Sequence, residues 1–152
     1  MQKLKNKDYS STLRDVPASI FISTYATYLK NSGQIQLPSW VDIVKSGAHK
    51  TFSPIDSDWI FLRLASLVRK IYINGGLGVG SLRKIYGNKK KRGTKPAKKK
   101  LSSGKIIRLA LKELERLKII EKSSTGKRYI TKKARKDIDI RSRKIFLVLE
   151  DQ

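Results

Sequence analysis

Apolar residues recur every three to four positions along most of this chain, a pattern typical of amphipathic α-helices. A first helix is predicted to open at Val16-Pro17, because proline is favourable in the first helical turn, and to end at Asn31-Ser32-Gly33. A second, short helix is predicted after Leu37-Pro38, with Ser39 as its cap.

The third predicted helix is the most apolar part of the chain and runs from cap candidates at residues 56–58 to about Ile73. Its apolar side chains, Trp59 among them, cover nearly the whole circumference. They leave one polar stripe, which consists of Arg63, Ser66 and Lys70. A helix that is apolar on nearly all sides is buried, so we expect this helix at the centre of the fold.

The second half of the chain predicts a different mixture of elements. A short helix over Val79–Tyr86 is followed by a helix over residues 102–117 and by two short strands around a Ser-Ser-Thr-Gly turn. Thr131 is expected to cap a last helix. The predicted fold class is therefore mainly α: a helical bundle around one central buried helix, winged-helix-like, with one short β-hairpin. The hairpin over residues 118–130 would be the wing, and helix 102–117 would be the recognition-type helix.

Three segments are predicted to lie outside this core. Residues 1–15 form a basic N-terminal arm, and residues 146–152 form a C-terminal tail. Residues 87–101, GNKKKRGTKPAKKKL, lie within the single domain 16–145 and are expected to be a basic loop that is flexible when unbound. The apolar run over residues 145–149 could extend the last helix, pack on the core or dock on a neighbouring protein; we favour core packing slightly.

Charge is the strongest compositional signal. Thirty-five Lys and Arg stand against twelve Asp and Glu, which gives a formal net charge of +23 and indicates a polyanionic partner. A membrane surface is disfavoured, because no predicted helix combines a basic face with a large unpaired apolar one. The sequence contains no cysteine, which excludes disulfides and thiolate metal sites. The polar first nine residues are not typical of a secretory signal, and no stretch approaches the ~20 apolar residues of a membrane span.

The positive charge is concentrated in the middle of the chain. Sixteen Lys and Arg lie between Asp58 and Glu113 without one acidic residue among them. Phosphates neutralise such a run by releasing condensed counterions, and arginines held on helices grip phosphate with two hydrogen bonds. Tyr72 and Tyr86 flank the segment and could stack on bases, although we expect at least one of them to be core. The candidate RNA-binding residues are Arg63, Arg69, Lys70, Arg83, Lys84, Lys89, Lys90, Lys91, Arg92, Lys95, Lys98, Lys99, Lys100, Lys105, Arg108, Tyr86, His49 and Lys50.

Signals for catalysis are weak. His49, beside Lys50, is the sole histidine, so a histidine-based metal site cannot form, and no carboxylate pair lies near it in sequence. The glycines of residues 75–80 lack the G-x-G-x-x-G spacing and follow a helix, whereas that fingerprint follows a strand. The sequence therefore predicts a protein that is not an enzyme and uses no metal, cofactor or small-molecule substrate.

Three stretches resemble one known family closely. They are LPSWVDIVKSGAHK, DWIFLRLASLVRKIYINGGLGVGSLRKIYG and IIRLALKELERLKIIEK, and the resemblance to the eukaryotic and archaeal small-subunit ribosomal protein nineteen covers roughly residues 16–140. The resemblance implies a helical bundle in the head of the small subunit, held mainly by ribosomal RNA beside neighbouring ribosomal proteins. In eukaryotes it also implies a role in maturation of precursor RNA, with nucleolar assembly and a cytoplasmic ribosome as destination. The family's basic surface maps onto Arg63, Arg69, Lys70, Arg83, Lys84, the 88–100 loop, Lys105 and Arg108. The lysine-rich loop and the apolar run near the C-terminus depart from the family's pattern.

A winged-helix DNA-binding regulator is the alternative. Such a protein reads bases with Asn, Gln or Arg along its recognition helix. Helix 102–117 offers Lys105, Arg108, Lys112 and Glu115 and has no Asn or Gln, which favours phosphate contact over base readout.

Overall fold

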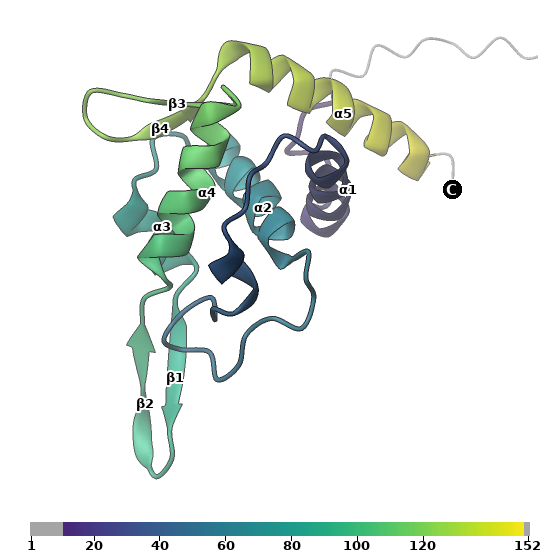
Figure 1. Cartoon of the computed structure of the whole chain (residues 1–152). Helices are drawn as coiled ribbons and strands as arrows, with labels where there is room; N and C mark the ends of the chain where they lie inside the picture. The colour runs from purple at the N-terminus through teal and green to yellow at the C-terminus, as the bar shows by residue number, and fades with distance from the viewer. Residues whose placement is uncertain (1–10, 151–152) are drawn as a thin grey trace, which may run out of the picture.

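The computed structural model of the chain describes residues 11–150, so most of the predicted basic arm and the last two residues of the predicted tail lie outside the described residues. Five α-helices, one 3-10 turn and two small antiparallel hairpins make up this part (Figure 1). In chain order the elements are α1 (Ala18–Asn31), η1 (Ser39–Asp42), α2 (Trp59–Asn74), α3 (Val79–Ile85), β1 (Asn88–Arg92), β2 (Lys95–Lys100), α4 (Gly104–Arg116), β3 (Ile120–Lys122), β4 (Arg128–Ile130) and α5 (Lys132–Glu150).

Helix α2 is the centre of the fold, as its apolar circumference predicts. It packs against α1, α4 and β4, and α5 crosses one end of the bundle (Figure 1). Leu64, Leu67 and Val68 on α2 are almost completely buried. Burial of each such side chain contributes roughly 1.5–3 kcal/mol, so this helix carries much of the free energy of folding. The other fully buried large side chains of the main core are Leu13, Phe21, Leu29, Ile71, Leu82, Ile107, Leu111, Leu114 and Ile138.

A second, smaller core lies at the amino end of α2. Val41 of η1 and Trp59 and Ile60 of α2 pack against Ile106 of α4. Trp59 is only 8% exposed, so the prediction that it is a core residue is confirmed. The cluster fixes η1 and the following loop beside the start of α4.

The mainly helical fold class and the wing-like hairpin β3–β4 are confirmed. Strand β3 pairs with β4 in register Ile120↔Ile130, Glu121↔Tyr129 and Lys122↔Arg128. Thr131 caps α5 as predicted, because its hydroxyl oxygen accepts a hydrogen bond from the backbone N–H of Ala134 at 3.2 Å.

The predicted basic loop over residues 87–101 is wrong in form, because this segment is a second antiparallel hairpin. Strand β1 pairs with β2 in register Asn88↔Lys100, Lys89↔Lys99 and Lys90↔Lys98, with an irregularity before Arg92↔Lys95. The two-residue turn begins with Gly93 at φ +68°, the left-handed conformation that glycine adopts without strain in a type II′ turn. The hairpin projects from the helical body at the end opposite α5 (Figure 1).

The base of this hairpin is packed too tightly for a side chain at residue 87. A Cβ on Gly87 would lie 2.6 Å from the carbonyl oxygen of Lys100 and 3.0 Å from that of Arg83. The hairpin is further tied to the body by the backbone N–H of Ser102, which donates to the Arg83 carbonyl, and by that of Ser103, which donates to the Ser46 carbonyl.

Both ends of the folded unit extend further than the sequence predicts. Leu13, which we assigned to the basic arm, is fully buried in the main core. At the other end α5 continues to Glu150, so the apolar run over residues 145–149 is helical. Ile145 and Phe146 pack partly against the main core, whereas Leu147 and Val148 are exposed. Core packing of the run is therefore confirmed for its first two residues alone.

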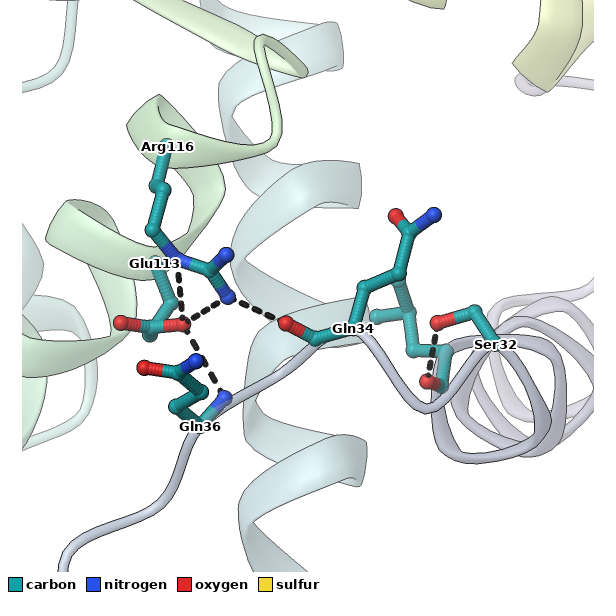
Figure 2. Close-up of polar contacts among 6 residues, drawn as sticks. Ser32, Gln34, Gln36, Glu113 and Arg116 are labelled. Carbon is teal, nitrogen blue, oxygen red and sulfur yellow. Dashed lines mark hydrogen bonds and ion pairs between the residues drawn. The ribbon is translucent and has the colours of Figure 1, made fainter.

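A buried carboxylate joins the segment after α1 to α4 (Figure 2). Glu113 is 8% exposed, and its Oε2 accepts a hydrogen bond from the backbone N–H of Gln36 at 3.3 Å. The same oxygen forms an ion pair with Arg116 at 2.7 Å, and Arg116 in turn donates to the carbonyl oxygen of Gln34. This network gives the irregular segment between α1 and η1 its polar anchor.

Glu113→Ala is expected to lower the free energy of unfolding by about 2 kcal/mol, because the Gln36 backbone N–H and Arg116 lose the buried carboxylate that both bind. Urea denaturation followed by circular dichroism measures the change. Glu121→Ala, at an exposed position of β3, is the matched control and is expected to stay within about 0.5 kcal/mol of wild type. An equal effect of both substitutions would contradict the role of the network.

Candidate nucleic-acid interface

The hairpin β1–β2 is the most concentrated positive element of the molecule. Every residue of both strands is exposed, and neither strand contains an acidic residue. Lysines face one another across the ladder, Lys89 opposite Lys99 and Lys90 opposite Lys98. Like charges directly opposite each other destabilise a hairpin unless something neutralises them. The arrangement therefore favours a polyanion along both faces of the hairpin. Its eight predicted contact residues are Lys89, Lys90, Lys91, Arg92, Lys95, Lys98, Lys99 and Lys100.

Arginines from α3 and α4 meet at the base of the hairpin. The Nε–H of Arg83 donates to the carbonyl oxygen of Ser102 at 3.1 Å, which orients the guanidinium. Gly104, the first residue of α4, has the side chains of both Arg83 and Arg108 beside it, since a Cβ there would lie 2.9 Å from an Arg108 nitrogen and 3.3 Å from Arg83. The two arginines are 25 positions apart in sequence, and the fold brings them together.

Two further candidates line the same end of the bundle. Lys105 lies over the ring of Trp40, with its Nζ 4.3 Å from the ring centroid, so its stem is held while the residue stays exposed. Lys84 is exposed on α3. Gly87 and Gly104 pack closely against the protein's own atoms.

A cavity of about 530 Å³ opens between α2 and the loop that precedes it; we call it the Arg63 pocket. Its lining includes Lys50, Phe52, Trp59, Arg63, Ser66 and Tyr86. The Arg63 guanidinium lies over the Tyr86 ring, 4.2 Å from the centroid, and the Tyr86 hydroxyl is hydrogen-bonded to the Ser66 hydroxyl at 2.7 Å. Burial lowers the pKa of Arg63 and raises that of Tyr86. Both effects arise from desolvation, so this charge is held partly out of water.

His49 lies beside this cluster without completing a catalytic site. Its ring packs against Gly47, and its Nδ1 is buried without a hydrogen-bond partner. Desolvation lowers its pKa, and the positive charges of Lys50 and Arg63 lower it further, so His49 is neutral near pH 7. A neutral ring surrounded by cations suits contact with a base or sugar better than contact with phosphate.

Three candidates on or near the carboxyl half of α2 have different surroundings. Tyr72 is 8% exposed and its hydroxyl donates to Asp139 at 2.7 Å, so it is core, as we expected of at least one of the two tyrosines. Arg69 is half-buried, and its Nε is buried without a hydrogen-bond partner. Lys70 is half-buried as well. No recorded contact joins Arg69 or Lys70 to the Arg63 pocket or to the hairpin base.

Apart from Lys50, sequence reasoning named no cation outside the central segment as a candidate. Arg141 of α5 lies over the ring of Tyr28, 3.5 Å from the centroid, and Arg135 lies over Tyr72 at 5.0 Å. The candidates were chosen by the absence of acidic residues between Asp58 and Glu113. Helix α5 carries acidic residues among its cations, so this criterion did not select it.

Other site chemistries find no support in the part of the chain that the structure describes. Between residues 11 and 150 no three His, Asp or Glu side chains gather in a way that could hold a metal ion. Over the same range, none of the helices has the length and apolar character that crossing a membrane requires.

The chain is similar to known proteins over nearly its whole length. The family described as ribosomal protein S19e matches residues 12–147. The small ribosomal subunit protein eS19 of Entamoeba histolytica is 43% identical over 129 residues, which cover 85% of this chain and 83% of that protein. The eS19B protein of Schizosaccharomyces pombe is 40% identical over 141 residues, 93% of this chain and 96% of its own length. The eS19 protein of Oryza sativa is 43% identical over 128 residues, 84% and 88% of the two chains.

Proposed function

The chain belongs to the ribosomal protein S19e family, and on that premise we propose that it is a structural, non-enzymatic component of the small ribosomal subunit that binds ribosomal RNA. One observation carries the RNA contact: a projecting hairpin whose eight cations are exposed, six of them paired with one another across the ladder, with no acidic residue in either strand. Only a dense array of phosphates neutralises such a surface, and ribosomal RNA supplies one.

The proposed contact surface comprises three parts. The hairpin β1–β2 reaches away from the body, its base carries Arg83 and Arg108, and the Arg63 pocket lies beside α2. Lysines dominate the hairpin and suit point-charge contact with phosphate, whereas the arginines at its base are oriented by the fold and suit two-pronged contact. A protein that binds by such surfaces positions RNA and does not read its sequence.

The remaining parts of the proposal follow from the family resemblance. They are a place in the head of the subunit beside neighbouring ribosomal proteins, a role in subunit assembly and precursor RNA maturation, and a cytoplasmic ribosome reached by nucleolar assembly. Support for a neighbouring protein comes from Leu147 and Val148, which are apolar and exposed at the end of α5.

A winged-helix DNA-binding regulator remains the second candidate. Helix α4, in the recognition position, offers Lys105, Arg108 and Lys112 on its exposed surface and no Asn or Gln. These residues support phosphate contact, and the relatives are named as small ribosomal subunit proteins, so we favour the first proposal.

Sedimentation of cell lysate on a sucrose gradient tests the proposal. Tagged protein is expected to migrate with small subunits and whole ribosomes and to leave them only at high salt. Recovery on chromatin, with none in ribosomal fractions, would overturn the ribosomal proposal in favour of the DNA-binding one.

Arg69 lies outside the three parts of the proposed contact surface but stays among the predicted RNA-binding residues, so Arg69→Glu tests it separately. We expect the substitution to impair incorporation into small subunits several-fold, because it replaces a cation of α2 by a negative charge that repels RNA phosphate. The measurement is the fraction of tagged protein in small-subunit peaks, with circular dichroism of the isolated protein to show that it stays helical. Arg143→Glu makes the same charge change at an exposed position of α5 outside the proposed surface. Normal incorporation of Arg69→Glu would remove this residue from the interface.

A further inference from the structure

The Arg63 pocket has features that phosphate binding does not require. Phosphates are bound by exposed cations, yet Arg63 is half-buried and stacked on a tyrosine at the side of an apolar cavity. Trp59 and Phe52 contribute apolar surface to the same cavity. A volume of about 530 Å³ lies within the range of small-ligand sites, roughly 300–1,000 Å³.

The stacked pair of Arg63 and Tyr86 is held in place by a hydrogen bond on the tyrosine side. Tyr86 is held by its hydrogen bond to Ser66, and the Arg63 guanidinium lies over the Tyr86 ring. No acidic side chain of residues 11–150 forms an ion pair with Arg63, and no hydrogen bond of its guanidinium is recorded there. The guanidinium therefore retains unused N–H donors. Because Arg63 lines the cavity, a ligand that enters the cavity can contact it.

The rim of the pocket also favours a covering partner. Phe52 is 82% exposed and Ile55 is fully exposed, and both lie in the loop that forms the outer wall. Large apolar side chains held in water beside a cavity mark a binding surface. Lys50 at the rim adds a charge that suits the phosphate attached to a bound base, and no acidic residue lines the pocket.

We propose that the Arg63 pocket receives one unpaired nucleobase of the bound RNA, stacked on the Arg63 guanidinium, with the adjoining phosphate beside Lys50. This rests on the proposed function, since it names the part of the RNA that the site takes. An unpaired base offers an exposed π-face on which the guanidinium can stack, whereas a base stacked inside a duplex does not. The site would thus bind a bulge or loop nucleotide and leave duplex contact to the hairpin.

Photocrosslinking in assembled subunits tests the proposal. A benzophenone side chain replaces Ile55, which is fully exposed, in tagged full-length protein, and crosslinks in gradient-purified small subunits are mapped by reverse transcription. The expected result is a crosslink to one nucleotide that is unpaired in chemical probing of the subunit RNA. The same replacement at Val148, exposed on α5, is the control for position and is not expected to give that crosslink.

A second variant separates stacking from charge. Arg63→Lys keeps the positive charge and loses the planar group, so the yield of the crosslink at that nucleotide is expected to fall about tenfold, as for the loss of a stacking contact. Arg143→Lys makes the same change at an exposed position of α5 and is expected to retain the yield.

Three results would overturn the proposal. Crosslinks to protein alone would assign the pocket to an apolar side chain of a neighbouring protein. Crosslinks to paired RNA alone would leave the proposed function standing without a base in the pocket. Failure of the wild-type tagged protein to enter small subunits would remove the proposed function and this inference with it.

Discussion

Trp59→Arg is expected to lower the free energy of unfolding by about 3–5 kcal/mol and the melting temperature by about 10 °C. Trp59 is 8% exposed and packs in the smaller core with Val41, Ile60 and Ile106. The substitution removes this packing and places an unpaired charge among apolar side chains. Because the smaller core joins η1 to α4, we expect the loss to appear in the cooperative unfolding of the whole domain.

Chemical denaturation monitored by circular dichroism measures this loss. Phe52→Arg is the matched control, because it exchanges an aromatic residue for arginine at a position that is 82% exposed and is expected to change stability by no more than about 0.5 kcal/mol. A Trp59→Arg protein as stable as wild type would show that the smaller core contributes nothing to folding.

Replacing Lys89, Lys90, Lys98 and Lys99 together by glutamine is expected to weaken binding to small-subunit ribosomal RNA about a thousandfold at 0.15 M salt. If each lysine neutralises one phosphate, the slope of log K against log salt becomes shallower by about 3.6, and the two proteins converge near 1 M salt. Filter binding or fluorescence anisotropy over a salt series gives both quantities.

Four lysine-to-glutamine replacements in the β3–β4 turn and on α5 provide the control. Lys127, Lys132, Lys133 and Lys136 are exposed, so their replacement by glutamine removes the same charge outside the proposed surface. An equal loss of affinity in both variants would mean that net charge alone drives binding. The hairpin variant is expected to be at least as stable as wild type, because it relieves the like-charge pairs Lys89–Lys99 and Lys90–Lys98.

The helical part of the fold was predictable because its signals are strong and local. The apolar circumference of α2 placed it at the centre, and Pro17 and Thr131 marked helix starts within a residue or two. The hairpin β3–β4 was predictable because a Ser-Ser-Thr-Gly turn separates two short strand-like segments.

The hairpin β1–β2 was missed because it lacks the usual signals of strands. Lysine has low β-propensity, and neither strand alternates apolar with polar residues, since both of its faces are exposed. The one local signal was Gly93-Thr94, a glycine-first two-residue turn with basic residues on both sides.

For the candidate site, the sequence could identify the charged residues but could not show which of them lie together in the fold. The absence of acids between Asp58 and Glu113 identified the cations that make up most of the proposed surface. That Arg63 stacks on Tyr86, or that Arg83 and Arg108 meet at Gly104, depends on tertiary packing between elements far apart in sequence. Likewise, the periodicity did not indicate that Leu13 belongs to the core. It left extension of the last helix as one alternative for residues 145–149, and α5 does reach Glu150.

The contact at Gly87 makes the hairpin behave as a lever. Strand β2 has six residues, so the arm is about 20 Å long, and a tilt of about 10° at its base moves its tip by about 3–4 Å. That displacement is comparable to the length of a hydrogen bond, enough to break the contact that we propose between a lysine and an RNA phosphate. A side chain at residue 87 would force the backbone at the base of the hairpin to shift, because its Cβ would lie 2.6 Å from the Lys100 carbonyl oxygen. The absence of a side chain at Gly87 therefore sets the direction in which the hairpin β1–β2, the most highly charged element, projects from the helical body.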